Sequence, residues 1–475
     1  TLTFLIAGSI ASWTSPTLPK LEAEDSPIPI TRDQGSWIVS IMGVGGILTP
    51  FPAGYLVNKY GRKALLLCTA LPFLLAWLLI IFASSATEIL LSRAVAGFGV
   101  GVTFAVCPIY VAEIADRNVR GTLGALMQLM MNVGSMFSYS LGPYVSYTTL
   151  GVLSAIFPVI YLVLMLFMPE TPYFLLMQGR REEAEASLMR LRGETNRQNI
   201  QVRSTVDTSD TEEELADIQT ALQQQMKEKG RPHDLIATRG TRRALIVGIG
   251  LIAIQQFGGI MAILSNAQGV FEITPGNTIK SSESAIVVGC IQVLVSFGTI
   301  FLVDRLGRRL LLMVSTSGCA MSLAVMGAYQ YVRLRTDVDT AVYDWVPLAC
   351  VVVFLVTYYL GVGPLPIAMM GEMFPSNVKG LALSIGSMLL SLCFVIVTKL
   401  YQVAVDGLGP YITFWFFAAV SATGISFVFF LVPETTGKSL ENIVMELNQT
   451  KQVKTAEKIV QDQPCVFTVS TQTKL

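Results

Sequence analysis

Apolar stretches of about 20 residues recur along almost the whole chain, and only 14% of its residues are charged, against about 25% in a soluble domain. Each stretch is long enough to cross the ~30 Å hydrocarbon core of a bilayer as a helix. Backbone groups in lipid need partners within the chain, so these stretches must be helical. The sequence therefore predicts an all-α membrane protein with twelve transmembrane helices, near residues 1–18, 36–56, 64–83, 88–110, 122–142, 149–168, 243–265, 284–303, 310–330, 345–371, 380–402 and 410–432.

Three short motifs occur once in each half of the chain and in the same order. They are YLVNKYGR and FLVDRLGR (55–62 and 301–308), EIADRNVRG and EMFPSNVKG (113–121 and 372–380), and PET twice (169–171 and 433–435). Their separations of 246, 259 and 264 residues are nearly constant, which indicates two six-helix halves of duplicated architecture. Repeated halves of apolar segments are typical of secondary transporters, whose substrate site lies between the halves.

The same pattern divides the chain and orients it. We expect an N-terminal six-helix bundle at 1–168, a cytosolic linker with short amphipathic helices at 169–242, a C-terminal six-helix bundle at 243–432, and a partly disordered cytosolic tail at 433–475. Lys and Arg gather in alternate short loops, for example at 59–63 and 305–309. The positive-inside rule places these loops and both termini in the cytosol. The chain begins without Met inside an apolar run, so we interpret it as lacking a short cytosolic head.

Composition argues against several other functions. Net charge is zero and the single histidine, His233, lies in a polar stretch, so neither a nucleic-acid partner nor a metal is expected. Six of the seven cysteines lie in apolar runs and Cys465 in the tail, so no disulfide is predicted. No nucleophile–base pair or phosphate-binding loop suggests an enzyme or a cofactor. The expected partners are membrane lipid and a small neutral substrate, and the expected location is the cell membrane.

The repeated motifs place acids and bases where helices meet the cytosol. These groups can pair across the seam between the bundles when the cytosolic side is closed and separate when it opens, as alternating access requires. The alternative is that they are charges that only set topology. Asn58 replaces the acid of the second half, which weakens the first half of the predicted lock. The predicted gating network comprises Gly61, Arg62, Glu113, Arg120, Glu170, Asp304, Arg308, Glu372, Lys379 and Glu434.

The segments AGYLVNKYGRK, SRAVAGFGVGV, PIYVAEIADRNVRG, PETPYFLLMQGR, QQFGGI, VDRLGRR and PETTGKSLEN carry a family resemblance. Together they resemble the sugar porters of the major facilitator superfamily over essentially all membrane spans. Residues 12–16, SWTSP, look most like insect facilitated trehalose and glucose carriers. The resemblance implies a rocker-switch fold of two six-helix bundles with a central polyol-sized site.

A neutral sugar needs uncharged amides, which both donate and accept hydrogen bonds, and apolar surfaces for its C–H faces. The resemblance implies sugar contacts at Gln128, Gln255 and Gln256. Gln292 stands where the family usually has Asn, and Asn266 lies near the outer end of the seventh span, so both are further candidates. A helix–helix hydrogen bond without a ligand is the alternative for each.

Departures from the family leave the sugar's identity open. Met261 replaces an expected Asn, Ile367 replaces an expected Trp, and Leu390-Ser391 replaces Asn-Trp; Ser265 and Asn266 replace an aromatic pair. The residues that let the tenth span bend are kept, and we expect them to form its hinge: Gly361, Gly363, Pro364 and Pro366.

Arg93 is an intramembrane charge in the fourth span. In proton-coupled sugar porters the equivalent Arg faces an Asp in the first span, but residues 4–16 contain no carboxylate. The sequence therefore predicts a facilitative uniporter of a hexose or trehalose. Three alternatives stay open: a carrier of another neutral polyol-like substrate, a proton-coupled sugar symporter, and a non-transporting sugar receptor.

Overall fold

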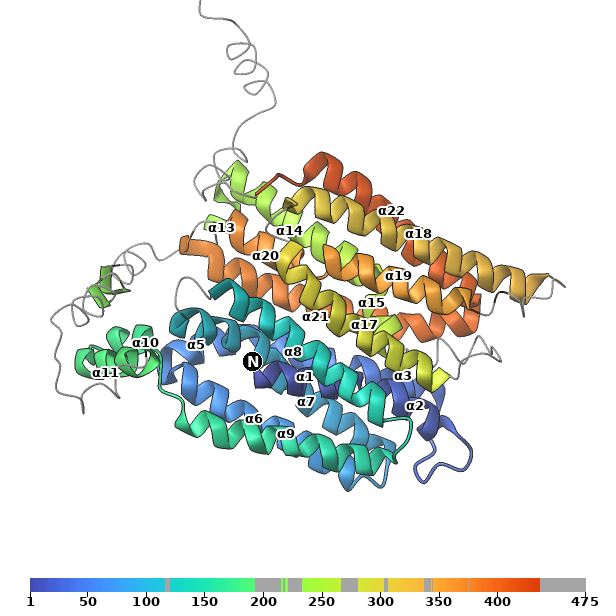
Figure 1. Ribbon diagram of the computed structural model, residues 1–475, viewed down its shortest axis with the longest axis horizontal. Coiled ribbons are helices and arrows are strands. Elements are labelled where there is room, and N and C mark those ends of the chain that lie inside the picture. The colour runs from blue at the N-terminus through green and yellow to red at the C-terminus, as the bar shows by residue number, and fades with distance from the viewer. Residues whose placement is uncertain are drawn as a thin grey trace, which may run out of the picture.

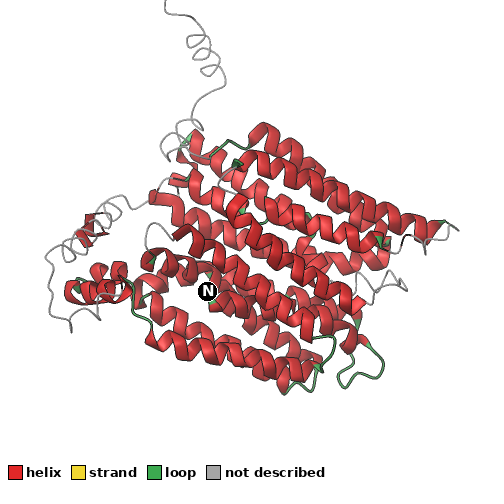
Figure 2. Ribbon diagram, in the orientation of Figure 1, coloured by secondary structure: helices red, strands yellow, loops and turns green. Residues whose placement is uncertain are grey.

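The computed structural model describes residues 1–115, 120–192, 215–216, 218–220, 233–265, 281–302, 306–336, 343, 345–374 and 376–435. Throughout these ranges the regular secondary structure is helical and no strand occurs (Figure 2). Eight helices or helix pairs there are long and apolar enough to cross a membrane, and a bent pair makes a ninth. The broken first span, α8 and α17 complete the twelve predicted spans. The all-helical membrane fold is thereby confirmed.

In the described residues of the first half, nine helices form the six spans, because the first and second spans are each broken into shorter helices. The second predicted span bends by 48° before Pro50, a proline at a position where its missing N–H costs nothing. The first span breaks at Trp13. The helices are α1 (Leu2–Ser12), α2 (Thr14–Glu22), α3 (Arg32–Ser40), α4 (Met42–Leu48), α5 (Pro50–Tyr60), α6 (Arg62–Ile81), α7 (Ala86–Ile114), α8 (Arg120–Leu141) and α9 (Tyr147–Phe167).

The second half repeats this arrangement after a short helix, α13 (Asp234–Ala237). Its seventh span breaks at Gly258-Gly259, where Gly259 has φ +85°, and its tenth breaks at 361–364. Helices α18 and α21 extend past the predicted ends at 330 and 402. The helices are α14 (Arg239–Phe257), α15 (Ile260–Ser265), α17 (Ser281–Leu302), α18 (Arg308–Arg335), α19 (Val346–Leu360), α20 (Leu365–Met373), α21 (Ser376–Leu408) and α22 (Pro410–Leu431).

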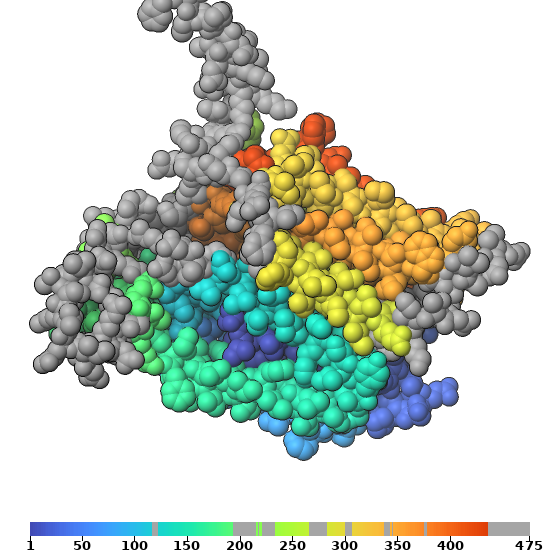
Figure 3. Space-filling model, viewed as in Figure 1, coloured from blue at the N-terminus to red at the C-terminus, as the bar shows by residue number. Residues whose placement is uncertain are grey.

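The two halves form separate helix groups with separate apolar cores. In Figure 1 the blue-to-green helices lie together below the lime-to-red helices, and the space-filling view shows the same division (Figure 3). One core cluster is drawn from the second half apart from Tyr139, and the other from the first half apart from Phe394. The halves meet where α17 packs along α8 and where α21 packs against α3 and α4.

Two short helices, α10 (Pro172–Met177) and α11 (Arg181–Arg192), project from one end of the first half (Figure 1). We call this the linker end, and the opposite end, which carries residues 23–31, the far end. Leu175, Ala184 and Leu188 pack with Leu215 in a small apolar cluster. The tail after 435 lies outside the described residues.

Candidate transport site and gates

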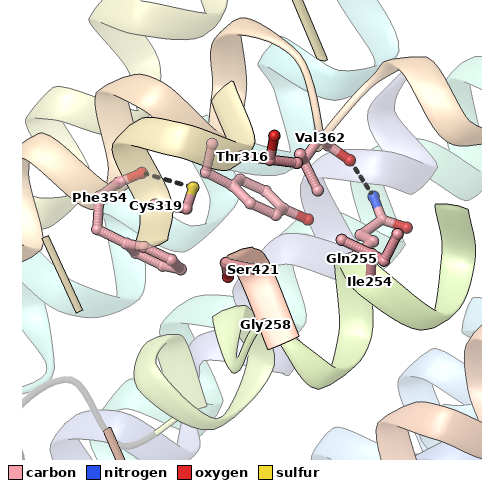
Figure 4. A pocket seen from close by; sticks show the side chains of 9 residues that line it. Ile254, Gln255, Gly258, Thr316, Cys319, Phe354, Val362 and Ser421 are labelled. Carbon is pink, nitrogen blue, oxygen red and sulfur yellow. Dashed lines mark hydrogen bonds between the residues drawn. The ribbon is translucent and has the colours of Figure 1, made fainter. Parts of the chain in front are cut away.

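Gln255 lies at the break of the tenth span. Its Nε2 donates to the carbonyl of Val362 at 2.9 Å (Figure 4) and to that of Gly363 at 2.7 Å. The break needs glycine at 361, because a Cβ there would lie 2.6 Å from the carbonyl oxygen of Leu311. Pro364 follows and cannot donate to the helix ladder. Gln255 therefore satisfies backbone acceptors that the break leaves without helical partners.

A small cavity adjoins Gln255 inside the second half. Its cavity volume is about 10 Å³, close to the ~10–15 Å³ that a single water molecule needs, so the cavity has no room for a sugar. Figure 4 shows its lining, which comes entirely from the second half: Ile254, Gln255, Gly258, Thr316, Cys319, Phe354, Tyr358, Val362 and Ser421. It is thus distinct from the substrate site predicted between the halves.

Gln256 presents the opposite situation to its neighbour. The side chain is 1% exposed, and within the described structure neither its Nε2 nor its Oε1 has a hydrogen-bond partner. Burying an unpaired polar group costs about 1–3 kcal/mol, and the Gln256 amide contains two such groups, a donor and an acceptor. An incoming hydroxylated ligand would satisfy both groups.

Gln128 and Gln292 join a hydrogen-bonded network that crosses the seam. Gln128 Nε2 donates to Asn132 Oδ1 at 3.4 Å, and Gln292 Nε2 donates to the Tyr359 hydroxyl at 3.3 Å. Tyr359 donates to Asn132 Oδ1 at 3.3 Å, and Asn132 Nδ2 donates to Ser296 Oγ at 2.5 Å. The structure thus brings two predicted candidates together through residues that the sequence analysis missed. The available signal was the four-residue spacing from Gln128 to Asn132, which puts both on one helix face.

Asn266 lies outside the described residues, but the preceding turn contacts the first half. Tyr139 donates to the Leu264 carbonyl at 2.9 Å, and Thr14 donates to the Ser265 carbonyl at 3.3 Å. Both bonds join α15 to the first half toward the far end. They were not predicted, because their acceptors are backbone groups.

Ion pairs join the halves at the far end itself. Lys399 Nζ of α21 lies 2.7 Å from Asp33 Oδ1 of α3, and it also donates to Ser36 Oγ at 2.7 Å. Arg32 pairs with Asp406 at 3.3 Å. The far-end seam is therefore held closed by charge pairs that the sequence analysis did not single out.

At the linker end the first half of the motif network is compact. Arg62 pairs with Glu113 at 2.7 Å, and Glu170 Oε1 accepts from the backbone N–H groups of Arg62 and Lys63 at 3.2 and 3.1 Å. Gly61 has φ +100°, and a Cβ there would lie 2.3 Å from Glu170 Oε2. Glycine is therefore required by both backbone conformation and space.

The second half repeats this geometry. Glu434 accepts from the N–H groups of Arg308 and Arg309 at 2.9 and 3.1 Å, and Arg308 pairs with Glu372 at 3.6 Å. Thr435 also donates to Glu372 Oε2 at 2.6 Å.

The two motif ion pairs that the structure describes each lie within one half, and pairing across the seam when the linker end closes stays a prediction. Arg62–Glu113 and Arg308–Glu372 each join helices of one half. The physical reason is that each basic residue begins a helix directly beside the acid of its own bundle. Asp304 and the side chain of Arg120 lie outside the described part of the chain. Lys379 lies on α21 near Gly371, where a Cβ would be 3.5 Å from its Cε.

Arg93 is 1% exposed and is held by backbone carbonyls. Its guanidinium donates to the carbonyl oxygens of Ile38, at 3.2 Å, and Ile10, and it lies over the Trp13 ring at 6.0 Å. Glu88, an acid of the same helix, accepts from the Ser84 N–H at 2.6 Å. Arg93 thereby ties the first and second spans to the fourth.

Two helical bundles, joined by an uncharged hydrogen-bonded network around Asn132 and by ion pairs at the far end, define a multi-pass membrane protein with the fold of the major facilitator superfamily. Solved structures show the same fold. The proton:xylose symporter XylE bound to 6-bromo-6-deoxy-D-glucose has a TM-score of 0.73 and 22% identity, covering 94% of this chain and 97% of that one. The inward open conformation of the xylose transporter XylE from E. coli has a TM-score of 0.75 and 21% identity, and it covers 94% of this chain and 97% of that one.

Residues 9–447 match the model of the family described as "Sugar (and other) transporter", and the chain belongs to that family. Similar relatives include "Facilitated trehalose transporter Tret1" of Aedes aegypti, 33% identical over 92% of this chain and 53% of that protein. The protein of the same name in Polypedilum vanderplanki is 34% identical over 92% of this chain and 84% of its own length. The chain spans about half the length of the Aedes aegypti relative and of a Drosophila willistoni one. These relatives are transporters, in agreement with the expectation that the chain is not an enzyme.

Proposed function

We propose that the protein moves a neutral sugar, a hexose or trehalose, across the cell membrane by alternating access, as a uniporter. The observation that carries this is Gln256, a buried side chain whose donor and acceptor are both unused in the described structure. A sugar hydroxyl supplies both partners, whereas an ion supplies only one kind. Relatives named as trehalose transporters support a sugar as the substrate.

Two features support alternating access. The apolar cores of the halves are separate, so the halves can move as bodies. The bonds that join them at the far end are few and polar, such as Lys399 to Asp33. Such contacts can be broken and remade more readily than a shared apolar core. We assign the bundles to residues 1–168 and 243–432, joined by the linker 169–242.

Uniport is supported by the surroundings of Arg93. Its hydrogen bonds go to two carbonyl oxygens, and a carbonyl does not take up and release a proton as a carboxylate does. The positive-inside pattern supports a cytosolic linker end, with both termini on that side.

The test is uptake of labelled trehalose and D-glucose by proteoliposomes that contain the full chain. Gln256→Leu should fold and raise the KM, because it removes the unused amide. Thr398→Val is the matched control, since its hydroxyl bonds only carbonyls of its own helix. Absence of saturable uptake of any neutral sugar or polyol in a panel would overturn the proposal.

A further inference from the structure

Asn132 lies in the middle of α8, and its side chain spans the seam between the halves. It is 2% exposed. Its Nδ2 donates to Ser296 Oγ of α17, and its Oδ1 accepts from the Tyr359 hydroxyl of α19. One amide of the first half therefore uses both its donor and its acceptor on the second half.

Close backbone packing makes these bonds possible. Gly289 of α17 faces Met136 of α8, and a Cβ at Gly289 would lie 3.1 Å from the Met136 Cα. The two helices thus approach closely about one turn from Gln292 and about two turns from Ser296. The Asn132 amide also lies within 3.4 Å of the Gln292 carbonyl oxygen, so it is seated against α17 by backbone as well as side-chain contacts.

An unused acceptor stands at the end of this network. Gln292 is 1% exposed; its Nε2 bonds Tyr359, but within the described residues its Oε1 has no partner. A buried acceptor without a donor is unfavourable. A ligand hydroxyl beside Tyr359 would relieve it. Among the described residues, the hydrogen bonds of this network involve no charged side chain, which suits a neutral hydroxylated ligand rather than an ion.

The bonds of Asn132 can persist only while the halves are together at this point. When the halves part, Asn132 loses its two cross-seam side-chain partners in one step. Its Oδ1 then keeps only the bond from Gln128 Nε2 of the same helix, at 3.4 Å, and its Nδ2 loses the Ser296 acceptor, which leaves a buried donor unpaired. A sugar hydroxyl entering the opened seam can replace both partners, because it donates and accepts.

We propose that Asn132 is a specificity-determining residue that exchanges its bonds to Ser296 and Tyr359 for a hydroxyl group of the sugar. This rests on the proposed function. It places part of the recognition of the substrate on the first half, in addition to Gln256 on the second half. The seam bonds and the sugar then compete for one amide, so binding of the sugar is coupled to separation of the halves.

The experiment compares wild type, Asn132→Leu and Asn132→Ser as full chains in proteoliposomes. Initial uptake of labelled D-glucose and trehalose gives KM and maximum rate, and a set of monodeoxyglucoses serves as competitors. Asn132→Leu should raise the KM by about tenfold, as expected for one lost hydrogen bond near the upper end of the usual range. One deoxyglucose that competes poorly with wild type should compete as well as glucose itself with the variant, because its missing hydroxyl no longer has a partner.

Thr299→Val is the matched control. Thr299 lies on the same helix as Ser296, and its hydroxyl bonds carbonyls of the second half only, at Val295 and Tyr359. It should keep the wild-type deoxyglucose profile. Asn132→Ser keeps a donor and an acceptor, so it should lie between wild type and Asn132→Leu, and it carries the test if Asn132→Leu does not fold.

A folded variant with unchanged KM and deoxyglucose profile would overturn the inference. A fall in the maximum rate alone would also overturn it, as would an equal loss of affinity for glucose and for every deoxyglucose. Either result would mean that Asn132 only holds the helices together and does not contact the sugar. The proposed function fails separately, if wild-type vesicles take up neither sugar and no other neutral polyol.

Discussion

The ammonium of Lys399, on α21, lies 2.7 Å from the carboxylate of Asp33, on α3. The two residues are 366 positions apart in the chain and belong to opposite halves. Lys399 also lies 4.5 Å from the centre of the Trp37 ring. One cation thus meets a carboxylate, a hydroxyl and an aromatic face, all on α3, and together they close the far-end seam.

We predict that Asp33→Asn opens this seam partially. The Asp33 side chain is 72% exposed, so the pair is worth only about 0.2–1 kcal/mol. The population with the far end open should rise by about two- to fivefold. Labelling of a cysteine introduced at Ser36 in a background without accessible native thiols measures the exposure.

The exchanged pair, Asp33→Lys with Lys399→Asp, is the control for that prediction. It should restore slow labelling, because the two opposite charges again attract each other after they have exchanged positions. Equal labelling rates in wild type, single variants and exchanged pair would show that the ion pair has no influence on the seam.

Gln255→Leu and Gln256→Leu should have different effects although the residues are adjacent. Gln255→Leu leaves the carbonyls of Val362 and Gly363 without their donor, so it should lower stability by about 1–3 kcal/mol per unpaired group. Gln256→Leu removes two unpaired groups and should leave stability equal or higher while weakening sugar binding. Thermal unfolding in detergent, with and without added sugar, measures both effects. A stable Gln255→Leu with normal unfolding would show that the tenth-span break does not depend on this residue.

The two motif ion pairs should differ in strength. The side chains of Arg62 and Glu113 are 7% and 12% exposed, and breaking a buried pair costs about 3–5 kcal/mol. Arg308 and Glu372 are 16% and 33% exposed and 3.6 Å apart. Glu113→Gln should therefore lower the unfolding temperature more than Glu372→Gln, by the same detergent assay. The reverse order would contradict the assignment.

Gly61→Ala should destabilise the protein, whereas Gly54→Ala should not. Gly61 combines φ +100° with a Cβ position 2.3 Å from Glu170 Oε2, which together should cost at least about 1–3 kcal/mol. Gly54, on the same span, has nothing within 4 Å of its Cβ position, and alanine there should gain up to ~1 kcal/mol of helix propensity. Equal unfolding temperatures for both variants would refute the role assigned to Gly61.

The sequence predicted the spans and the local motifs because these follow from apolar length and from short-range pattern. It predicted Gln255 and Gln256 as a pair, but it could not separate their roles, because one meets backbone carbonyls 107 and 108 residues away. Asn132 and Lys399 were missed for the same reason: their partners lie in the other half, at distances along the chain that carry no pattern. The sequence also did not single out the pairs Arg62–Glu113 and Arg308–Glu372 within each half, because pairing within a half and pairing across the seam fit the same spacing.

Proton coupling supplies the last prediction: an inward pH gradient should not drive accumulation of sugar. Coupling needs a group that gains and loses a proton in response to the site, and the guanidinium of Arg93 bonds carbonyl oxygens of Ile10 and Ile38 instead of a carboxylate. Arg93 should stay charged and structural, so Arg93→Gln should lower stability without creating or removing a pH dependence of uptake. The measurement is sugar uptake by proteoliposomes with and without the gradient, with a protonophore as control. Internal sugar rising above the external concentration, and collapsing when the protonophore is added, would show a symporter.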